Sequence, residues 1–505
     1  MNSGNPSDDL GRLHAMGYAQ ELRRILGGFS NYALSLSIIC ILAGGITSFH
    51  VGYGAVGGAA AGFIWPAWTL VSLCVAMAMG QVASAFPTAG GLYHWAAILG
   101  GRFWGYLVGW LNLAGLVTVL AAINVGTVRF AGTLAGSQAE HPLIQAAIVA
   151  AITLSQAAIN HMGIRATRVL VDFSGWWIVG VSAAIVIIVA AWAPSLSIER
   201  VFTWSNMSGL PADAPVWPAS ESVPWLALMA VLLPAYTITG FDASAHASEE
   251  TIDAAREVPK AMVRSVVVSG IAGWIMLSIV AASIENPREV AGAGEGAFMR
   301  ALELAAGRPA SLAIGWAAVV AQYLCGLATV TAASRMAWAF ARDGGLPWSS
   351  ILARVSHHSR APVACIWSVA AISALFTIWA PIYATIASIC TILLYLSYVV
   401  PLILAARALG REWTNTGPFD LGVWFKPAAI ISAAGCAGLV AIGVQPPNDQ
   451  ALVALAGLGG LLMACWWIVA SRTFKGPPRI GSADSGRLLE IRNTEAEIAR
   501  EDSGP

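Results

Sequence analysis

Four titratable residues stand within one short segment, TGFDASAHASEET at 239–251. Asp242 and His246 are four residues apart, which places their side chains on one face of a helix. Because imidazole titrates near neutral pH, such a pair can exchange a proton. Glu249 and Glu250 follow directly and offer carboxylates for ion pairs. Three residues, 236–238, separate this segment from the apolar run VPWLALMAVLLPA at 223–235. The elements around the segment therefore decide what it can do.

The composition is that of an integral membrane protein. Of 505 residues, 57% are hydrophobic and 11% are charged, whereas soluble domains have roughly a quarter charged. Uncharged runs such as 452–470 approach the roughly 20 residues that a helix needs to cross a bilayer. The lipid bilayer is therefore an expected partner. Basic and acidic residues are equal in number, 27 each, which gives no reason to expect nucleic acid.

Cysteine usage and the first residues exclude further classes. The seven cysteines stand singly in apolar runs, so we interpret them as small core residues rather than as disulfides or metal ligands. We expect no metal and no cofactor. The first 28 residues lack a short apolar core with a cleavage site, and we expect no cleaved signal peptide.

The hydropathy pattern predicts an all-α membrane protein of about twelve transmembrane helices. The predicted spans are 29–49, 64–86, 103–134, 142–160, 171–193, 224–248, 264–284, 309–341, 362–380, 383–405, 425–444 and 451–471. Residues 1–28 and 473–505 are then tails on one side, flanking a transmembrane domain at 29–472. The C-terminal tail is polar and charged, and we expect it to be mobile.

The connections predict the orientation. With the N-terminus inside, the cytoplasmic connections hold Arg102, Arg165, Arg168, Arg256, Lys260, Arg264, Arg342, Arg354, Arg360, Arg407, Arg411 and Lys426. The outward connections hold only Arg129, Arg200, Arg288, Arg300 and Arg308. Positive residues concentrate on the cytoplasmic side of membrane proteins. Both termini are therefore expected in the cytoplasm, and the protein in the inner (plasma) membrane.

Two predicted spans carry interruptions. The first contains Gly44, Gly45 and Thr47, and the sixth contains Pro234, Thr237, Thr239 and Gly240. Pro removes a backbone donor and Gly weakens a helix, so both positions are expected to unwind. Spans one and six correspond in two five-helix halves, about 29–193 and 224–405, and an odd number of spans inverts the second half. Broken helices at matching positions of inverted halves indicate a transporter site at the midplane.

Several motifs carry a specific resemblance. They are FSNYALSLSIICILAGGIT (29–47), ASAFPTAGGLYHWAA (83–97), INHMGIRATR (159–168), TGFDASAHASEET (239–251) and ASRMAWAFARDGGLP (333–347). Over roughly 25–472 the chain resembles the amino acid–polyamine–organocation superfamily, and within it the amino acid/choline transporter family of GABA and choline permeases. The resemblance implies a leucine-transporter-type fold with 5+5 inverted repeats, broken helices one and six, and two extra helices at 425–471.

A substrate site is expected between the two breaks. Backbone N–H groups around Ile46 and Thr47 suit a carboxylate, and carbonyls near Ala43, Gly44, Tyr236 and Thr237 suit an ammonium group. By resemblance, Tyr236 is the expected aromatic lid. The expected substrate-binding set is Ala43, Gly44, Gly45, Ile46, Thr47, Tyr236, Thr237, Gly240, Phe241 and Asp242.

The role of the acidic motif has alternatives. Asp242 can bind the amine, hold a proton, or cap the second half-helix. His246 can exchange a proton with Asp242 or be a packing residue. The Glu249–Glu250 pair is expected in an inner gate, paired with Arg256, Lys260 or the arginines of INHMGIRATR.

The coupling ion is H⁺ or Na⁺. Sodium-coupled relatives place helix-eight hydroxyls against the first break, which predicts a sodium site of Ala43, Ile46, Thr329 and Thr331. Relatives that do not use sodium carry a Lys in helix five, and none occurs between residues 163 and 192. Proton symport, sodium symport and exchange stay open, and the titratable pair Asp242 and His246 favours the proton.

These observations predict a permease that imports a small amino acid or related amine, such as GABA, by alternating access. One alternative is a choline or quaternary-amine transporter, for which Tyr236, Phe241, Trp110 and Tyr323 would supply an aromatic cage. A second is a sensor that binds substrate without transport, although such sensors usually carry long added cytoplasmic domains. A membrane enzyme is disfavoured because His246 lacks convergent metal ligands or a nucleophile partner.

Overall fold

The computed structural model describes residues 6–136, 142–379, 383–446, 448–478 and 485–502. Parts of the two predicted tails, residues 1–5, 479–484 and 503–505, lie outside the described residues, as does the last residue of the span predicted at 362–380.

The described chain is helical throughout its membrane region. Ten helices are long and apolar enough to cross a membrane, and two shorter apolar helices, Val223–Thr237 and Val363–Ile378, stand where spans six and nine are predicted. The single-helix spans are α5 (Trp65–Ala85), α7 (Arg102–Ala135), α8 (Pro142–His161), α9 (Ile164–Trp192), α14 (Ala254–Ser283), α17 (Arg308–Arg342), α19 (Val363–Trp379), α20 (Tyr383–Ala408), α21 (Phe425–Gly443) and α22 (Asp449–Cys465). The twelve-span prediction is confirmed.

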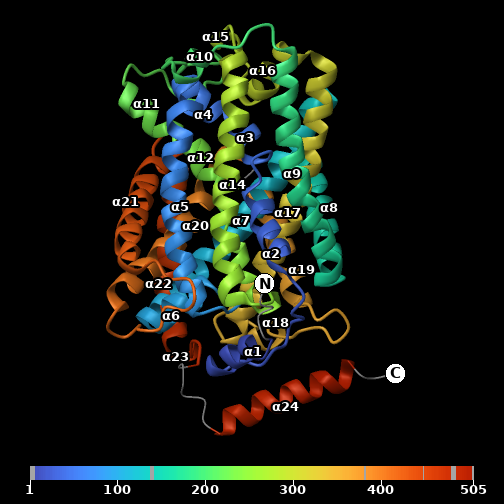
Figure 1. Cartoon of the computed structure of the whole chain (residues 1–505), viewed down its shortest axis with the longest axis vertical. Helices are drawn as coiled ribbons and strands as arrows, with labels where there is room; N and C mark the ends of the chain where they lie inside the picture. The colour runs from blue at the N-terminus through green and yellow to red at the C-terminus, as the bar shows by residue number, and fades with distance from the viewer. Residues whose placement is uncertain (1–5, 137–141, 380–382, 447, 479–484, 503–505) are drawn as a thin grey trace.

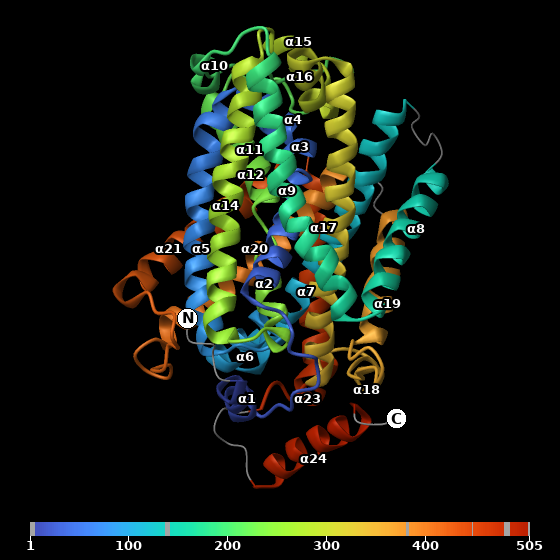
Figure 2. The same cartoon turned by 45° about the vertical axis from the view of Figure 1, so that its right-hand side comes forward.

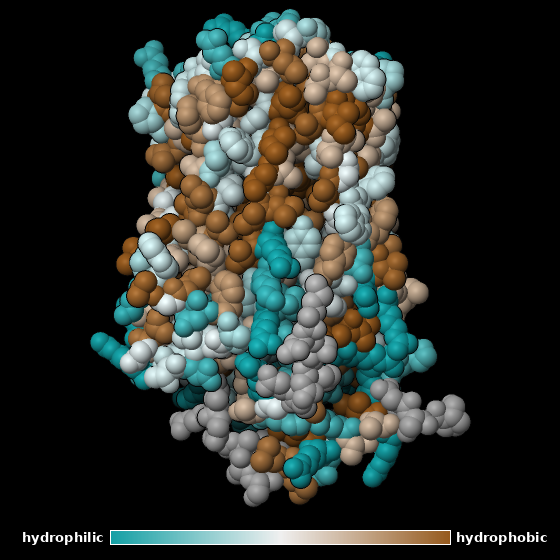
Figure 3. All heavy atoms as spheres, viewed as in Figure 1, coloured by the Kyte–Doolittle hydropathy of each residue, from teal (hydrophilic) through white to brown (hydrophobic). Residues whose placement is uncertain are grey.

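The bundle has two distinct ends (Figures 1 and 2). The terminal end carries α1 (Pro6–Ala15), α6 (Leu92–Gly100), α18 (Ser349–Leu352), α23 (Ser471–Thr473) and α24 (Ser485–Asp502). The far end carries α10 (Ile198–Phe202), α15 (Pro287–Ala291) and α16 (Ala297–Ala306). On the face in Figure 3, apolar side chains cover the middle of the bundle, and hydrophilic side chains gather toward its ends.

The first span is broken into three helices. They are α2 (Gly28–Ile39), α3 (Gly44–Thr47) and α4 (Phe49–Val56). Helix α2 ends because Cys40 adopts a positive φ of 23°, which an L-residue rarely takes. Such backbone persists only where its surroundings enforce it, commonly at functional sites. The irregular stretch 40–43 is therefore built into the centre of the bundle.

The sixth span is broken as well, into α11 (Val223–Ala230), α12 (Leu232–Thr237) and α13 (Ala243–His246). The interruption at Val231 has a local cause, because Pro234 lacks the N–H that would bond to the carbonyl of Ala230. Beyond α12 the chain leaves the helix over 238–242, where Gly240 has φ +88°. A 3-10 turn, Ser248–Glu250, completes the span.

The two broken spans lie side by side in opposite directions. Helix α4 contacts α11, α3 contacts α12, and α2 contacts α13. Both irregular stretches therefore meet in the middle of the molecule. Helix α17 packs on α2 and α13, and α20 packs on α12, so these two helices line the meeting point.

Both tails contain packed structure. The N-terminal tail forms α1, and Leu13, Tyr18 and Leu26 are buried against the bundle. The C-terminal tail, which we expected to be mobile, forms α24. Its Glu495 accepts hydrogen bonds from His14 (2.7 Å) and from the backbone of Gln20 (3.0 Å). The prediction missed this helix because contacts with the N-terminal segment, rather than its own polar sequence, hold it.

Candidate functional site

The unwound positions differ in detail from those predicted. Gly44, Gly45, Ile46 and Thr47 lie in or border α3, and the irregular backbone precedes them at 40–43. Pro234, Tyr236 and Thr237 are helical in α12, and the second irregular stretch begins after them. Thr239, Gly240, Phe241 and Asp242 do lie in that stretch.

Gly44 serves close packing rather than unwinding. A Cβ at Gly44 would stand 2.8 Å from the Cα of Thr237, so α3 and α12 touch at this point. Gly45 next to it is different, because its Cβ would meet only Met276 at 3.6 Å and the ring of Trp65 at 4.0 Å, ordinary contact distances.

This contrast gives a first prediction. Gly44→Ala should destabilise the fold by about 1–3 kcal/mol through overpacking, and amino acid uptake should fall with it because the two breaks are forced apart. Gly45→Ala should leave thermal stability and uptake close to the parent. Thermal unfolding in detergent and uptake into vesicles measure both variants, and equal effects at the two glycines would contradict the packing account.

The second irregular stretch is satisfied by side chains from two neighbouring helices. The hydroxyl of Tyr395 donates to the carbonyl of Ile238 (3.0 Å), and the N–H of Gly240 donates to the hydroxyl of Tyr398 (3.0 Å). Ser35 of α2 donates to the carbonyl of Phe241 (2.8 Å). Backbone that leaves a helix inside a membrane needs such partners. The break is therefore a fixed feature of the packing.

Asp242 is completely buried and has three side-chain partners. The hydroxyl of Tyr398 donates to its Oδ1 (2.7 Å), and the amide of Asn112 donates to its Oδ2 (3.0 Å). The Nε2 of His246 lies 3.2 Å from the same Oδ2. The capping interpretation is wrong, because the side chain of Asp242 makes no cap hydrogen bond to α13.

The geometry of His246 fixes how many protons the pair holds. Its Nδ1 lies 3.1 Å from the carbonyl of Ala89, which can only accept, so Nδ1 carries a hydrogen. The Nε2 then bonds to Asp242 only if one more proton lies between them, on the ring or on the carboxyl group. Without that proton, two lone pairs would face each other at 3.2 Å. In this geometry one proton therefore lies between Nε2 of His246 and Oδ2 of Asp242.

A second buried histidine–aspartate pair makes a useful comparison. His94 in α6 has Nε2 2.9 Å from Oδ2 of Asp343, and its Nδ1 is 2.5 Å from the hydroxyl of Thr88. Because a hydroxyl can donate to Nδ1, a neutral imidazole satisfies both contacts. Burial lowers the pKa of His94. Burial alone would raise the pKa of Asp343. The hydrogen bond from His94 and other contacts lower this pKa by more, so the net shift is downward. This pair needs no additional proton.

The Glu249–Glu250 pair finds other partners than those predicted. Glu249 binds Arg342 at 2.8 Å, and Glu250 binds Arg335 at 3.0 Å; both arginines come from α17. Arg256 and Lys260 pair within their own helix region, with Asp253 and Glu257. Arg168, from INHMGIRATR, lies beside Asp172. The two buried pairs tie the end of span six to α17 near the terminal end.

The N-terminal segment reinforces this closure. The N–H groups of Ile25 and Leu26 donate to the carbonyl of Glu250 at 2.9 and 2.8 Å. Tyr18 donates to Asp343 at 2.7 Å, and the guanidinium of Arg342 lies 3.9 Å from the centre of its ring. The terminal end is thus held shut by contacts from three separate parts of the chain.

Three residues of the predicted sodium site, Ala43, Thr329 and Thr331, have hydrogen-bond partners within the protein. The carbonyl of Ala43 accepts from both the backbone and the hydroxyl of Thr47, at 3.1 and 2.6 Å. Thr329 donates within its own helix to Cys325 (2.9 Å), and Thr331 donates to Asn160 of α8 (2.8 Å). The first break instead meets α17 at Cys325, whose thiol lies 3.4 Å from the carbonyl of Ile38.

The aromatic residues considered for a cation cage are also dispersed. Phe241 is buried against Tyr398, and Tyr323 bonds to Ser155 of α8. Trp110 lines an apolar groove with Leu113 and Phe376. Tyr236 lies elsewhere, in a cavity of about 500 Å³ toward the far end that also contains Ser48 and Trp217.

Three residues that hold the second break in place were missed by sequence reasoning. Asn112, Tyr395 and Tyr398 are polar side chains within predicted spans, and polar groups at membrane depth are a recognised signal for function. Tyr395 and Tyr398 are three residues apart and therefore share a helix face. That spacing was the available signal.

Two interrupted helices that meet inside a twelve-span bundle are the arrangement of a secondary transporter. Comparison with known proteins gives the family: the model of the amino acid permease family matches residues 26–470. The chain belongs to this family. It is 30% identical to the amino-acid permease BAT1 of Arabidopsis thaliana and 32% identical to the BAT1 homolog of Oryza sativa subsp. japonica, each alignment covering 92% of this chain and 95% of the relative. It is also 24% identical to an uncharacterized amino-acid permease of Schizosaccharomyces pombe, over 98% of this chain and 91% of the relative.

These comparisons make the chain a multi-pass membrane transporter rather than an enzyme. The family resemblance inferred from the motifs is confirmed.

Proposed function

We propose that this permease imports a small zwitterionic amino acid, GABA or a similar compound, together with a proton. The observation that carries the proposal is the Asp242–His246 pair. It lies at the second break, it is completely buried, and its hydrogen bonds require one shared proton. Binding and release of that proton change the charge at the break, and a charge change in a low-dielectric site alters the energy of each conformation strongly.

The substrate is placed between the two breaks. Span one supplies irregular backbone at 40–43, span six supplies Gly240 and Phe241, and Tyr236 stands above them toward the far end. Thr47 is less available than expected, because its N–H donates to Ala43. Asp242 already has three partners, so we assign it the proton rather than the substrate amine.

The terminal end is assigned to the cytoplasm and the protein to the plasma (inner) membrane. The positive connections support this assignment. The cavities that reach Thr47 and Tyr236, beside the breaks, lie toward the far end, whereas a cavity of about 1530 Å³ at the terminal end is lined by no residue of 40–43 or 238–242. Together with the buried ion pairs at the terminal end, this arrangement supports an outward-facing state. Import requires the terminal end to open in the alternate state.

The rival ligands and ions have less support. A quaternary amine would need aromatic rings around one point, and the four candidate rings are dispersed. Sodium would need the oxygens of Ala43, Ile46, Thr329 and Thr331 in one place, and the hydroxyl of Thr331 bonds to Asn160 instead. A sensor would retain the closed terminal end without cycling.

Uptake into proteoliposomes tests the proposal. Radiolabelled GABA, L-alanine, cationic and acidic amino acids, and choline are each offered with a proton gradient, a sodium gradient or none. We expect an amino acid to accumulate only under the proton gradient. Uptake of choline alone would favour the quaternary-amine alternative, sodium-driven uptake would overturn the coupling, and binding without uptake would favour a sensor.

A further inference from the structure

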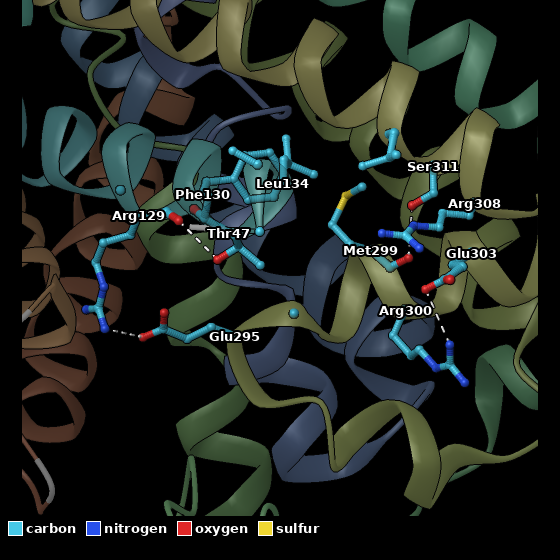
Figure 4. A pocket seen from close by; sticks show the side chains of 16 residues that line it. Thr47, Arg129, Phe130, Leu134, Glu295, Met299, Arg300, Glu303, Arg308 and Ser311 are labelled. Atoms are coloured by element: carbon cyan, nitrogen blue, oxygen red, sulfur yellow. Dashed lines mark hydrogen bonds and ion pairs between the residues drawn. The ribbon is translucent and has the colours of Figure 1, made fainter. Parts of the chain in front are cut away.

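Two cavities separate the substrate region from the far end, and one ion pair borders both. The first, about 410 Å³, has Thr47 among its lining residues, and the second, about 500 Å³, has Tyr236. Arg129 of α7 and Glu295 of the 3-10 turn Gly294–Gly296 line both cavities. Figure 4 shows this pair reaching across, with Thr47 nearby. A solute that moves from the far end through either cavity passes these two charges.

The pair is loosely held. Nη2 of Arg129 and Oε1 of Glu295 are 3.6 Å apart, and their side chains are 42% and 58% exposed. An exposed pair of this kind adds little to stability. A ligand can therefore replace the contact between the two charges with only a small loss of free energy.

A buried histidine beneath the pair points to a polar occupant. His50 of α4 lines the second cavity together with Arg129 and Glu295, and it is only 9% exposed. Its Nδ1 has no well-formed hydrogen bond among the described residues, and its polar contact is with the backbone of Thr47, beside the first break. A polar solute in the second cavity can complete this ring nitrogen.

The other charges around the first cavity are differently placed. Arg300 pairs with Glu289 at 2.6 Å and with Glu303 at 3.3 Å. Arg308 stands exposed at the start of α17 and lines the first cavity only. Arg129 and Glu295 are the charges that face both cavities.

We propose that Arg129 and Glu295 form a reception site for zwitterions, which binds an amino acid before it reaches the breaks. The guanidinium of Arg129 takes the carboxylate, for which its planar fork is suited. The carboxylate of Glu295 takes the ammonium group. A zwitterion replaces both halves of the ion pair at once, whereas a compound with a single charge leaves one half without a partner. This site rests on the proposed function and adds the basis of its selectivity.

The test compares three charge-neutral variants: Arg129→Gln, Glu295→Gln and, as a matched control, Glu289→Gln. Glu289 pairs with Arg300 at the same end, and its side chain is also partly exposed, but it lines neither cavity. Initial rates of radiolabelled GABA and L-alanine uptake are measured at low and high salt, with L-alaninamide, which carries only the ammonium group, as competitor.

Exposed charges act mainly on encounter and are screened by salt. We expect Arg129→Gln and Glu295→Gln to raise KM about three- to tenfold at low salt, with maximal rate retained and the difference reduced at high salt. L-alaninamide should inhibit uptake by Arg129→Gln almost as well as uptake by the wild type. It should inhibit uptake by Glu295→Gln clearly less, because Glu295 is the residue assigned to the ammonium group. Glu289→Gln should resemble the wild type.

The outcomes separate the two proposals. Wild-type protein that transports neither GABA nor L-alanine under any gradient would count against the proposed function itself. Wild-type transport with equal KM values in all three variants would overturn the reception site alone. The reception site would also be overturned if Arg129→Gln weakened the apparent affinity for L-alanine and for L-alaninamide equally. The ion pair would then affect the opening of the far end and would not recognise the carboxylate of the substrate.

Discussion

Replacing Asp242 with Asn should lower proton-driven amino acid uptake about a hundredfold. Asn cannot share a proton with His246, and its amide group would face either the amide of Asn112 or the hydroxyl of Tyr398 as a donor. A hydrogen bond to a charged group is worth about 1.5–3 kcal/mol, so losing the shared proton and one partner accounts for this magnitude. His246→Gln should have the same effect on the proton dependence. Uptake is measured at several outside pH values with inside pH fixed.

The second buried pair provides the control for this prediction. Asp343 is also buried beside a histidine, but its hydrogen bonds are complete with a neutral ring. Asp343→Asn should change the rate of uptake and leave the dependence on the proton gradient intact. If Asp242→Asn keeps both its uptake and its pH dependence, the proton role of this carboxylate is wrong.

Among the variants proposed for stability, replacing Glu250 with Gln should lower the free energy of unfolding the most. Glu250 and Arg335 are both fully buried, and Gln leaves the guanidinium charge without its carboxylate. Breaking a buried pair from one side costs about 3–5 kcal/mol. We therefore expect a large drop in the thermal unfolding temperature in detergent. A double variant, Glu250→Gln with Arg335→Met, removes the stranded charge and should recover part of the stability.

Glu257→Gln is the matched control for this second prediction. Glu257 pairs with Lys260 at the same end, but that pair is partly exposed. Its loss should change stability by less than about 1 kcal/mol. Equal shifts of the unfolding temperature in Glu250→Gln and Glu257→Gln would show that the buried pair does not hold the terminal end.

The sequence predicted the spans well because apolar length is a local property of the chain. The contact between Asp242 and His246 was also predicted locally, since the two residues are four positions apart on one helix face. The partners of Glu249 and Glu250 were mispredicted for the opposite reason. Arg342 and Arg335 lie 93 and 85 residues away in sequence, and only the packing of α17 brings them into contact.

The exact positions at which the two spans leave the helix could not be predicted from the sequence. Gly44 looked like an unwinding point, but it is a contact point with Thr237, and the chain leaves the helix at Cys40, a residue with no breaking tendency. Tertiary contacts, including the thiol of Cys325 beside Ile38, decide that position. The same limit applies to Tyr395 and Tyr398, whose importance depends on where span six unwinds.

Proton movement driven by the amino acid is the most direct test of the central claim. The wild-type protein is reconstituted with a pH-sensitive dye inside the vesicles, with equal pH on both sides, and GABA or L-alanine is added outside. We propose that the Asp242–His246 pair carries one proton inward with the substrate, so the interior should become acidic with wild-type protein and stay unchanged with His246→Gln. Uptake of the radiolabelled amino acid without acidification by the wild type would contradict proton coupling through this pair.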